Sequence, residues 1–472
     1  MAVRTRFAPS PTGFIHVGNL RSAVFTYLIA KKEEGTFVLR IEDTDQERYV
    51  KGAVDAIYYT LNTCGLLWDE GPDKGGEFGP YIQSERMANY KKYALELVEK
   101  KEAYKCFCTE ERLASMREKG YAKYDGLCSH LTDDEIKQKE DAGLPYVIRQ
   151  KTPDTGATSF TCKVFGTITI DNKEIEDQII LKSDEYPTYN FANVIDDHLM
   201  NITHVVRGNE YLTSTPKYTL LYKALGWEEP TYVHLPLVVK EGGKKLSKRE
   251  GDAYFSDFVQ KGFLPEAIVN YIALLGWSPE DNEEIFTLEE LTSKFTMARI
   301  NKSPSTFDVK KLAWVNSHYI KNLSIEDLKE ICMPHLVEND IVQGKPEAWV
   351  NSLITVFKDR MSFGAEIIDL YNEFLEVEFK LDEEASDFLN QEGVNETLTV
   401  FRNLLQDLEE FSASDIKPLI KQTGKEAGSK GKMLFMPLRI ATTASMHGPD
   451  LPQVLSLLGK EIVIERLNSL IK

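Results

Sequence analysis

The beginning of this 472-residue chain constrains its fold more than any other stretch, because RTRFAPSPTGFIHVGNLR over residues 4–21 predicts a strand, a turn and a helix. The strand covers residues 3–7, and the helix begins near Gly18. A turn of this kind directs backbone N–H groups and the positive end of a helix dipole into one crevice, which suits phosphate. His16 lies at the turn, and an ordinary strand-to-helix connection is the alternative. The apolar residues expected on one helical face are Leu20, Val24, Tyr27 and Leu28.

The residues after this helix predict a parallel α/β sheet. Gly35 ends the helix and residues 36–41 form a buried strand, which completes a strand–helix–strand unit with a right-handed crossover. The acidic residues 42–47 follow at the carboxyl end of that strand, where open α/β sheets bind ligands. The pattern returns with strands at 203–207 and 231–239, so the sheet is interrupted by an insertion.

The last part of the chain predicts helices. Apolar residues recur at helical spacing from residue 264 onward, and Thr287 and Ser324 are expected helix starts. A strongly acidic segment at 382–410 precedes a basic run whose members are Lys417, Lys421, Lys425, Lys430, Lys432 and Arg439. This run offers a surface for nucleic acid, and a solvated helix face is the alternative.

Composition restricts the class of protein. The net charge of −18, from 56 basic and 74 acidic side chains, argues against a surface covered in positive charge but not against one local basic face. Six cysteines in so long a chain do not make a disulfide framework, so a reducing compartment is expected. The chain shows no export or import leader and no apolar run of about 18 residues, so we predict a cytoplasmic protein without a membrane span.

A split phosphate site is predicted from two distant segments. His16 and Gly18 lie at the opening turn, whereas a basic loop follows the strand at 231–239. Charged donors on one loop that face a helix N-terminus after another strand can hold a triphosphate and stabilise charge during attack on its α-phosphorus. A solvated basic loop is the alternative, and no P-loop pattern is present. The residues of the loop are Lys245, Ser247, Lys248 and Arg249.

Two arginines suggest a receptor for a carboxylate. Arg6 precedes the opening turn and Arg207 ends a strand of the second half of the sheet. Guanidinium groups that converge on a crevice bind a carboxylate in bidentate fashion, and such a site rejects an amide. An internal Arg–Glu ion pair is the alternative.

Four further residues have the composition of a zinc site. Cys106 and Cys108 form one pair, Cys128 and His130 form another, and together they would supply three sulfur atoms and one nitrogen to tetrahedral Zn²⁺. The alternative is buried free cysteines, because Cys-x-Cys is a less usual ligand spacing than Cys-x₂-Cys. The remaining cysteines, Cys64, Cys162 and Cys332, are expected to be small core residues.

These motifs together resemble those of class I aminoacyl-tRNA synthetases. PSPTGFIHVGN and KLSKR resemble the two signatures of that class, with Asn19 in place of a histidine and Leu246 in place of a methionine. Similarity to glutamyl-tRNA synthetases of the bacterial type extends over nearly the whole chain. It includes RIEDTD at residues 40–45 and the stretches 187–200, 206–210, 262–267 and 307–312.

The resemblance implies an architecture. A Rossmann-like catalytic domain (residues 1–103 and 186–243) would be split by an inserted α+β domain that binds the acceptor stem and carries zinc (104–185). A helical connector (244–323) and an all-helical anticodon-binding domain (324–472, divided near 378) would follow.

The resemblance also implies roles for individual residues. Contacts to L-glutamate fall on Arg6, Ala8, Ser10, Glu42, Tyr189, Asn193 and Arg207, with Glu42 receiving the α-ammonium. Contacts to ATP fall on Thr12, His16, Gly18, Glu210, Lys245, Lys248 and Arg249, and the catalytic set is His16, Gly18, Lys245, Ser247 and Lys248. Anticodon contacts fall on Arg360, Arg439, Pro449 and Leu451.

The implied activity is ATP- and Mg²⁺-dependent ligation of glutamate to tRNA(Glu) by a monomer, and tRNA(Gln) stays open as a second substrate. Three rivals share part of the pattern. A glutaminyl-tRNA synthetase should end in β-barrels, a pantothenate-synthetase-like ligase would not need the helical half, and a non-catalytic tRNA-binding paralogue should have lost His16, Lys245 or Lys248.

Overall fold

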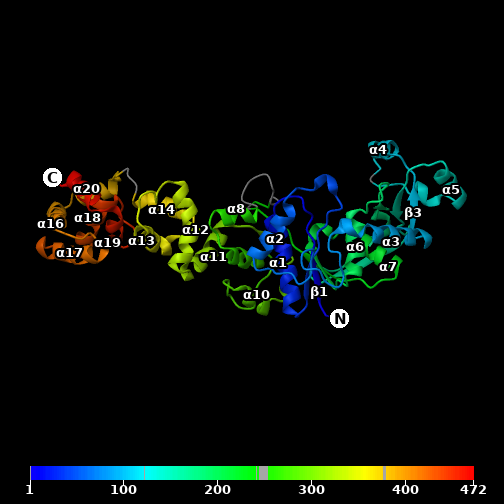
Figure 1. Cartoon of the computed structure of the whole chain (residues 1–472), viewed down its shortest axis with the longest axis horizontal. Coiled ribbons are helices and arrows are strands. Elements are labelled where there is room, and N and C mark those ends of the chain that lie inside the picture. Colours follow the sequence, from blue (N-terminus) through cyan, green and yellow to red (C-terminus); the bar gives the residue numbers. More distant parts are fainter. Residues whose placement is uncertain (1, 122, 241, 244–253, 376–378, 472) are drawn as a thin grey trace. The chain divides into compact units, whose positions relative to one another are not determined.

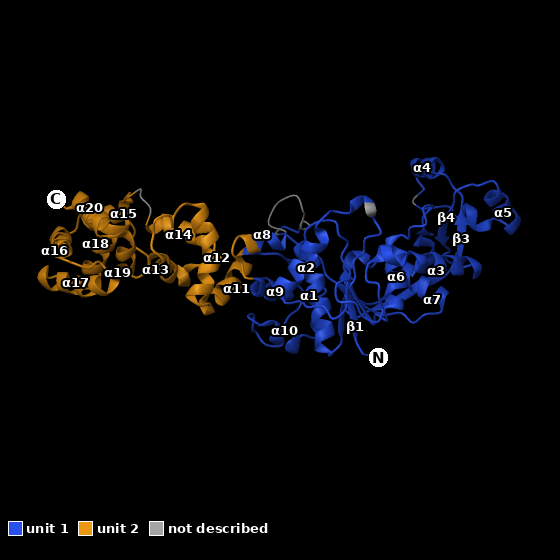
Figure 2. Cartoon of the chain, in the orientation of Figure 1, with its two compact units in different colours: residues 1–258, 265–309 blue, residues 259–264, 310–472 orange. Residues whose placement is uncertain are grey.

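A computed structural model of the chain describes residues 2–121, 123–240, 242–243, 254–375 and 379–471. The chain forms two compact units, coloured separately in Figure 2. Unit 1 contains residues 1–258 and 265–309, and unit 2 contains residues 259–264 and 310–472. The four-part division predicted from the sequence is finer than this and stays a prediction.

Unit 1 is built on a six-stranded sheet with the order β2-β1-β8-β9-β5-β6. β1, β2, β8 and β9 pair in parallel, β5 joins β9 in parallel through Cys162 and Tyr232, and β6 is antiparallel to β5. The two halves of the predicted parallel sheet therefore meet at β1 and β8. The strands are β1 (Arg4–Phe7), β2 (Thr36–Leu39), β5 (Ala157–Cys162), β6 (Gly166–Asp171), β8 (His204–Gly208) and β9 (Thr231–Leu235).

The opening strand, turn and helix form as predicted. Helix α1 (Val17–Lys32) follows the turn, and Leu20, Val24 and Leu28 on its predicted face are buried. Gly35 then lets β2 start beside the entry to β1, because a Cβ atom there would lie 2.2 Å from the carbonyl oxygen of Val3. Figure 1 shows α1 and α2 (Ala53–Thr63) in blue.

The segment predicted as an insertion contributes to two sheets. Its strands β3 (Ala103–Cys106), β4 (Val147–Gln150) and β7 (Ile179–Leu181) form a separate antiparallel sheet, whereas β5 and β6 extend the main sheet. A capping box at Thr132 starts α5 (Asp133–Asp141). The other helices of unit 1 are α3 (Met87–Glu99), α4 (Glu110–Glu118), α6 (Tyr189–Leu199), α7 (Thr215–Leu225), α9 (Pro265–Leu274) and α10 (Leu288–Lys294).

Short elements complete unit 1. The strand predicted at 231–239 is divided at Pro236, so that β10 (Val238–Val239) pairs in parallel with β11 (Ser305–Thr306), a small ladder that the sequence did not indicate. Thr287 caps α10 with a full capping box, as expected. The 3₁₀ helices of this unit are η1 (Gln46–Arg48), η2 (Gln83–Arg86), η3 (Leu127–His130), η4 (Asn172–Glu174), η5 (Asn209–Tyr211) and η6 (Met297–Arg299).

The regular elements described within unit 2 are all helices, as the apolar spacing predicts, and the described part of this unit shows none of the β-barrels expected of the glutaminyl rival. They enclose a large core in which Leu353, Phe357 and Phe401 are fully buried, and a smaller cluster around Phe388. The helices are α12 (Ile325–Glu338), α13 (Glu347–Phe357), η7 (Lys358–Arg360), α14 (Glu366–Phe374), α15 (Glu383–Leu389), α16 (Val394–Gln406), α17 (Ala413–Glu426), α18 (Lys432–Thr443), α19 (Leu451–Leu458) and α20 (Lys460–Leu470). Two further helices, α8 (Phe255–Gln260) and α11 (Val309–Asn322), cross the boundary between the units.

Among the described residues, no helix combines the length and the apolar character needed to cross a membrane.

Candidate active site

A pocket of about 360 Å³ opens at the carboxyl end of the main sheet, beside the start of α1. It brings His16 and Gly18 together with Glu210, so three of the residues predicted to contact ATP line one cavity. A Cβ atom on Gly18 would meet only the His16 ring, at 3.5 Å, so packing within the protein does not require glycine there. The full lining consists of His16, Gly18, Asn19, Arg21, Ser22, Gly208, Glu210, Pro236, Leu237 and Val238.

His16 caps helix α1 with its side chain. Its Nδ1 accepts a hydrogen bond from the backbone N–H of Gly18 at 3.1 Å. A neutral imidazole that accepts through Nδ1 carries its proton on Nε2. The buried ring is therefore in the tautomer that can donate to a phosphate oxygen.

Beneath the crevice, Arg6 belongs to a buried network of ion pairs. Its guanidinium donates to both carboxylate oxygens of Asp197, at 2.8 and 3.2 Å. Arg40 also reaches Asp197 at 2.8 Å and Glu42 at 2.8 Å. Arg86 donates to Asp196 at 2.6 Å. The alternative weighed from the sequence, an internal ion pair, is thus what the structure shows for Arg6, with an aspartate as the partner.

Three guanidinium groups in this network face three carboxylates, so its formal charges cancel. Burial alone would raise the pKa of Asp197, but Arg6 and Arg40 outweigh that effect and hold the pKa below its ordinary value. Burial also raises the pKa of Glu42, an effect that Arg40 and Arg6 oppose. Paired charges of this kind are stable only while every partner is present.

Arg207 lies in the same crevice with a different set of neighbours. It is buried among the rings of Tyr211, Tyr218 and Tyr232, whose centroids lie 5.3, 4.5 and 5.6 Å from its guanidinium carbon. Its Nε and Nη1 atoms have no hydrogen-bond partner, and no described carboxylate is within ion-pair distance. An uncompensated buried cation is costly, which indicates a place for an anionic ligand.

The other residues predicted to contact glutamate lie near Arg207. The hydroxyl of Tyr189 is within electrostatic reach of both Glu42 and Arg207. Asn193 is buried one helical turn further along α6 and donates to the carbonyl oxygen of Tyr189 at 2.9 Å. Glu42 keeps its Oε2 atom buried and without a partner. The turn residues Ala8, Ser10 and Thr12 precede α1, where the backbone N–H of Thr12 donates to the carbonyl oxygen of Ser10 at 2.8 Å.

The basic loop predicted to complete the phosphate site lies outside the described residues. Its members are Lys245, Ser247, Lys248 and Arg249.

Three of the four residues predicted as zinc ligands lie close together in the structure. The sulfur atoms of Cys106, Cys108 and Cys128 lie within 4.8 Å of one another, and in the described chain no other His, Cys, Asp or Glu joins them. His130, the predicted fourth ligand, is exposed at the end of η3. A 3₁₀ helix has three residues per turn, so side chains two residues apart point in different directions. That geometry separates His130 from Cys128.

The predicted anticodon residues lie in unit 2, where Arg360 is exposed, Arg439 is half-buried and Pro449 is buried. Arg439 donates to the carbonyl oxygen of Pro449 at 2.8 Å, and its buried Nη1 has no partner. Burial lowers the pKa of Arg439, and the nearby charge of Arg360 lowers it further. Leu451, in contrast, is buried in the helical core, so its side chain has no surface for a base.

Several residues of the crevice were not singled out from the sequence. Arg21 is buried in the wall of the pocket and donates to the carbonyl oxygen of Leu275 at 3.0 Å, and burial lowers its pKa to about 10. Arg40, Asp196 and Asp197 hold the network together. Two adjacent aspartates inside an otherwise apolar helix are a signal of buried pairing that the sequence does carry.

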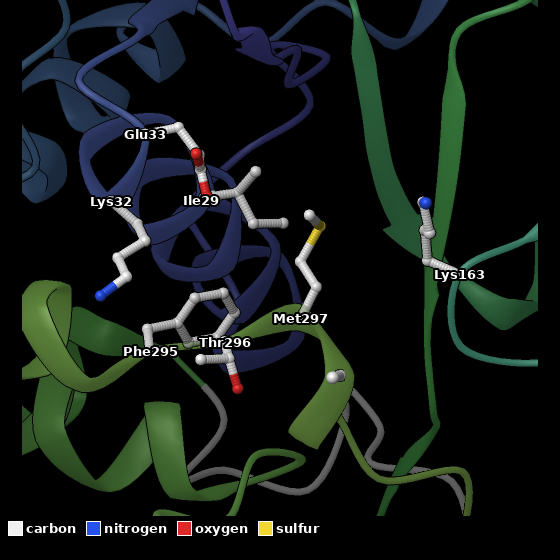
Figure 3. Close-up of a pocket in the computed structure, with 8 residues that line it drawn as sticks. Ile29, Lys32, Glu33, Lys163, Phe295, Thr296 and Met297 are labelled. Carbon is white, nitrogen blue, oxygen red and sulfur yellow. The ribbon is translucent and has the colours of Figure 1, made fainter.

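A second pocket, of about 390 Å³, lies at the other end of α1 (Figure 3). Figure 3 shows Lys32 and Glu33 from α1, Phe295 and Met297 from the segment that follows α10, and Lys163 after β5. None of the residues predicted as functional lines it. Of these two pockets, only the one at the N-terminal end of α1 is lined by residues predicted to bind a substrate.

Both the N-terminal and the C-terminal part of the chain match models of known protein families. Residues 2–314 match the family model "tRNA synthetases class I (E and Q), catalytic domain", and residues 327–471 match "Anticodon binding domain". The chain is 50% identical over 473 residues to the glutamate–tRNA ligase of Clostridium novyi, covering 98% of this chain and 96% of the relative. It is 46% identical to that of Geobacillus thermodenitrificans, covering 98% of both chains.

Solved structures agree with the sequence comparison. The glutamate-tRNA synthetase of Elizabethkingia anophelis is 34% identical with a TM-score of 0.90, and the match covers 100% of both chains. The glutamate tRNA ligase of Elizabethkingia meningosepticum, solved in complex with its amino acid, is 34% identical with a TM-score of 0.88, covering 100% of this chain and 99% of the other.

Proposed function

Because this chain belongs to the glutamate–tRNA ligases, within the class I tRNA synthetases, we propose that the crevice between β1 and β8 activates L-glutamate with ATP. In the first step the α-carboxylate of glutamate attacks the α-phosphorus of ATP, and pyrophosphate leaves. In the second step a hydroxyl of the terminal ribose of tRNA(Glu) attacks the activated carbonyl carbon, and AMP leaves.

The observation that carries this proposal is the unpaired guanidinium of Arg207. A side-chain carboxylate would supply the charge and the acceptors that its Nε and Nη1 atoms lack. Glutamine would leave that charge uncompensated and turn an NH₂ group toward the donors, so it would be rejected. Asp197 already neutralises Arg6. Arg6 would therefore stabilise the wall of the site, and Arg207 would supply the positive charge that binds the carboxylate.

Glu42 supplies the complementary group for the other end of the substrate. Its Oε1 is held by Arg40 at 2.8 Å, whereas its buried Oε2 is unpartnered and available to an ammonium group. Tyr189 and Asn193 flank this position, and Ala8 and Ser10 belong to the turn beside it.

ATP would occupy the pocket at the start of α1. The His16 ring would donate to a phosphate oxygen from Nε2, the N-terminus of α1 would attract negative charge, and Thr12 and Gly18 would lie beside the phosphates. Glu210 offers an exposed carboxylate in this pocket, the kind of oxygen ligand that suits Mg²⁺. Lys245, Ser247, Lys248 and Arg249 complete the proposal from outside the described residues.

We assign a structural zinc ion to the cysteine cluster. Cys106, Cys108 and Cys128 supply three sulfur atoms at mutual distances that one ion can span. The zinc would join β3 to the segment that contains η3, within the insertion that we propose contacts the acceptor stem.

For the RNA, we propose that the anticodon is met by Arg439 and Arg360, with Pro449 beside them. Arg439 has Arg360 as a neighbouring cation and Asp450 as a neighbouring carboxylate, and its buried Nη1 has no hydrogen-bond partner, which favours an acceptor on the edge of a base. Whether tRNA(Gln) is also charged depends on this contact. A monomer that acts in the cytoplasm remains our prediction.

The experiment is glutamylation by the full chain, assayed separately on purified tRNA(Glu) and tRNA(Gln) transcripts with ATP and Mg²⁺. Glutamate should be attached to tRNA(Glu), and glutamine at the same concentration should not. Absence of charging on both transcripts would contradict the proposal. Charging of tRNA(Gln) would define a non-discriminating enzyme and leave the mechanism unchanged.

A further inference from the structure

Four side chains form a series of hydrogen bonds that leaves the crevice, enters the inserted segment and returns. The hydroxyl of Tyr218 donates to Oδ1 of Asn190 at 2.6 Å, and Nδ2 of Asn190 donates to Oε1 of Gln178 at 3.0 Å. Nε2 of Gln178 donates to Oε1 of Gln150 at 2.7 Å. Nε2 of Gln150 then donates to the carbonyl oxygen of Lys217 at 3.0 Å. We call these four side chains the amide relay.

The amide relay joins the inserted sheet to the two helices beside the proposed glutamate site. Gln150 ends β4 and Gln178 precedes β7, and the backbone N–H of Gln150 also donates to the carbonyl oxygen of Gln178 at 2.9 Å. Asn190 lies in the first turn of α6, and Tyr218 lies in α7. Since Gln150, Gln178 and Tyr218 are buried, loss of one bond would leave a buried polar atom unsatisfied.

The carbonyl group of Lys217 determines the direction of every bond in the amide relay. A carbonyl oxygen can only accept, so Gln150 must turn its NH₂ group toward Lys217 and its oxygen toward Gln178. The same requirement then orients Gln178 and Asn190, whose oxygen must face Tyr218. Because the hydroxyl proton of Tyr218 is donated to Asn190, Tyr218 has no proton to offer a substrate carboxylate.

Tyr218 instead supports Arg207. Of the three tyrosine rings around that guanidinium, the ring of Tyr218 is the nearest, with its centroid 4.5 Å from the guanidinium carbon. The negative face of an aromatic ring attracts a cation. A hydrogen bond at the hydroxyl end fixes where the ring lies, so the amide relay controls the surface against which Arg207 is held.

We propose that the amide relay positions Arg207 for L-glutamate through the ring of Tyr218. Its other members, Asn190, Gln178 and Gln150, are then positioning residues and not substrate contacts. The inference rests on the function proposed above, and it assigns the inserted sheet a part in amino-acid recognition that is separate from any contact with RNA.

The test removes one member of the amide relay and asks whether the effect passes through Tyr218. Full-length wild type is compared with Gln178→Leu, Tyr218→Phe and the double variant. Steady-state glutamylation of tRNA(Glu) gives kcat and KM for glutamate. The rise in unfolding temperature on addition of glutamate measures binding without turnover.

Asn172→Leu is the matched control. Asn172 is a buried amide of the same inserted segment that lies outside the amide relay. Both ends of its side chain are bonded, since it accepts from Thr158 at 2.6 Å and donates to the carbonyl oxygen of Thr155 at 2.8 Å. Its loss should therefore lower the unfolding temperature as Gln178→Leu does and leave KM for glutamate unchanged.

Gln178→Leu and Tyr218→Phe should each raise KM for glutamate about 3- to 10-fold, the range of one neutral hydrogen bond, with a smaller change in kcat. The double variant should match Tyr218→Phe within about 2-fold, because the amide relay acts only through that hydroxyl. If Gln178→Leu does not fold, Gln150→Leu takes its place in the same comparison.

Three results would overturn the proposal and leave the proposed function intact. They are an unchanged KM in Gln178→Leu, effects that multiply in the double variant, and a rise of KM in Asn172→Leu equal to that in Gln178→Leu. Wild-type protein that glutamate stabilises but that does not ligate it would contradict the proposed reaction alone, and the unfolding temperatures would then decide the role of the amide relay. Wild-type protein that shows neither property overturns both.

Discussion

Arg6 and Arg207 enter one crevice from neighbouring strands, yet their surroundings are opposite. Arg6 is bound on two sides by Asp197 and lies in a network whose charges cancel. Arg207 is enclosed by tyrosine rings and keeps two donor atoms unpaired. The first arrangement stabilises the fold, and the second can bind a ligand. Although the sequence predicted the same role for both arginines, we expect substitutions around Arg6 to lower stability and substitution of Arg207 to lower activity.

Removal of the unpaired charge should abolish selection of glutamate. Arg207→Met keeps the volume of the side chain, and we expect kcat/KM for glutamate to fall at least about 10⁴-fold, because a site built for a hydrogen-bonding carboxylate loses both charge and donors. The folded state should be as stable as the wild type or more stable, since a buried uncompensated cation is removed. Steady-state glutamylation and thermal unfolding check the two parts.

A stable but fully active Arg207→Met enzyme would contradict the distinction between the arginines. Arg207→Lys serves as the control, because it keeps the charge and loses the planar fork. Its activity should lie between those of the wild type and the methionine variant.

Removal of a partner from the neutral network should act on stability instead. Asp197→Asn would leave Arg6 and Arg40 without their shared carboxylate, and we expect unfolding to become easier by about 3–5 kcal/mol. The exposed pair of Lys91 and Glu185 is the matched control, and Glu185→Gln should change stability by less than about 1 kcal/mol. Urea unfolding of the full-length variants measures both. Equal effects of the two substitutions would show that the network is not the stabilising element.

Glu42 connects the two regions, with one oxygen in the network and one open to the site. Glu42→Gln should raise KM for glutamate by about 10- to 100-fold with a smaller change in kcat, because the variant loses an ionic contact to the ammonium that the ground state already makes. Asp43→Asn is the control, since Ser84 already holds that carboxylate at 2.8 and 2.6 Å. An unchanged KM in Glu42→Gln would place the ammonium elsewhere.

The sequence predicted the turn, the helix and the strands that surround the site, because short-range sequence patterns determine these elements. The opening turn, the helix that begins beside Gly18 and the strands on either side of the insertion follow from periodicity and turn residues. His16 and Gly18 of the turn motif line one cavity with Glu210, which the family resemblance gave as an ATP contact and which lies nearly 200 positions further along the chain.

The sequence could not assign charge partners or the last zinc ligand. Asp197 lies 191 positions from Arg6, and no spacing rule connects them, so the residues alone favoured an internal ion pair over an open receptor but could not name its partner. His130 has the residue type of a zinc ligand, but the 3₁₀ turn that separates it from Cys128 depends on tertiary folding.

The smallest effect concerns His234, which lies beside Arg207 in the sheet and contacts Thr215 at 3.1 Å. Burial lowers the pKa of His234 from 6.5 to about 3, and the charge of Arg207 contributes in the same direction. Between these values the unfolded chain binds one more proton than the folded chain. Stability from this residue is therefore complete above pH 6.5 and falls on acidification, by at most about 1.4 kcal/mol per pH unit.

Comparison of the wild type with His234→Gln isolates this contribution, because other acid-titrating groups are common to both proteins. The slope of stability against pH between 6.5 and 3 should be shallower by one proton in the variant, whatever its stability at neutral pH. Arg207→Met should end the loss of stability at a higher pH and make the total loss smaller, since removal of a neighbouring cation raises the pKa of His234 in the folded chain. A profile that does not respond to Arg207→Met would mean that the guanidinium is already neutralised in the free enzyme, and the contrast with Arg6 would no longer hold.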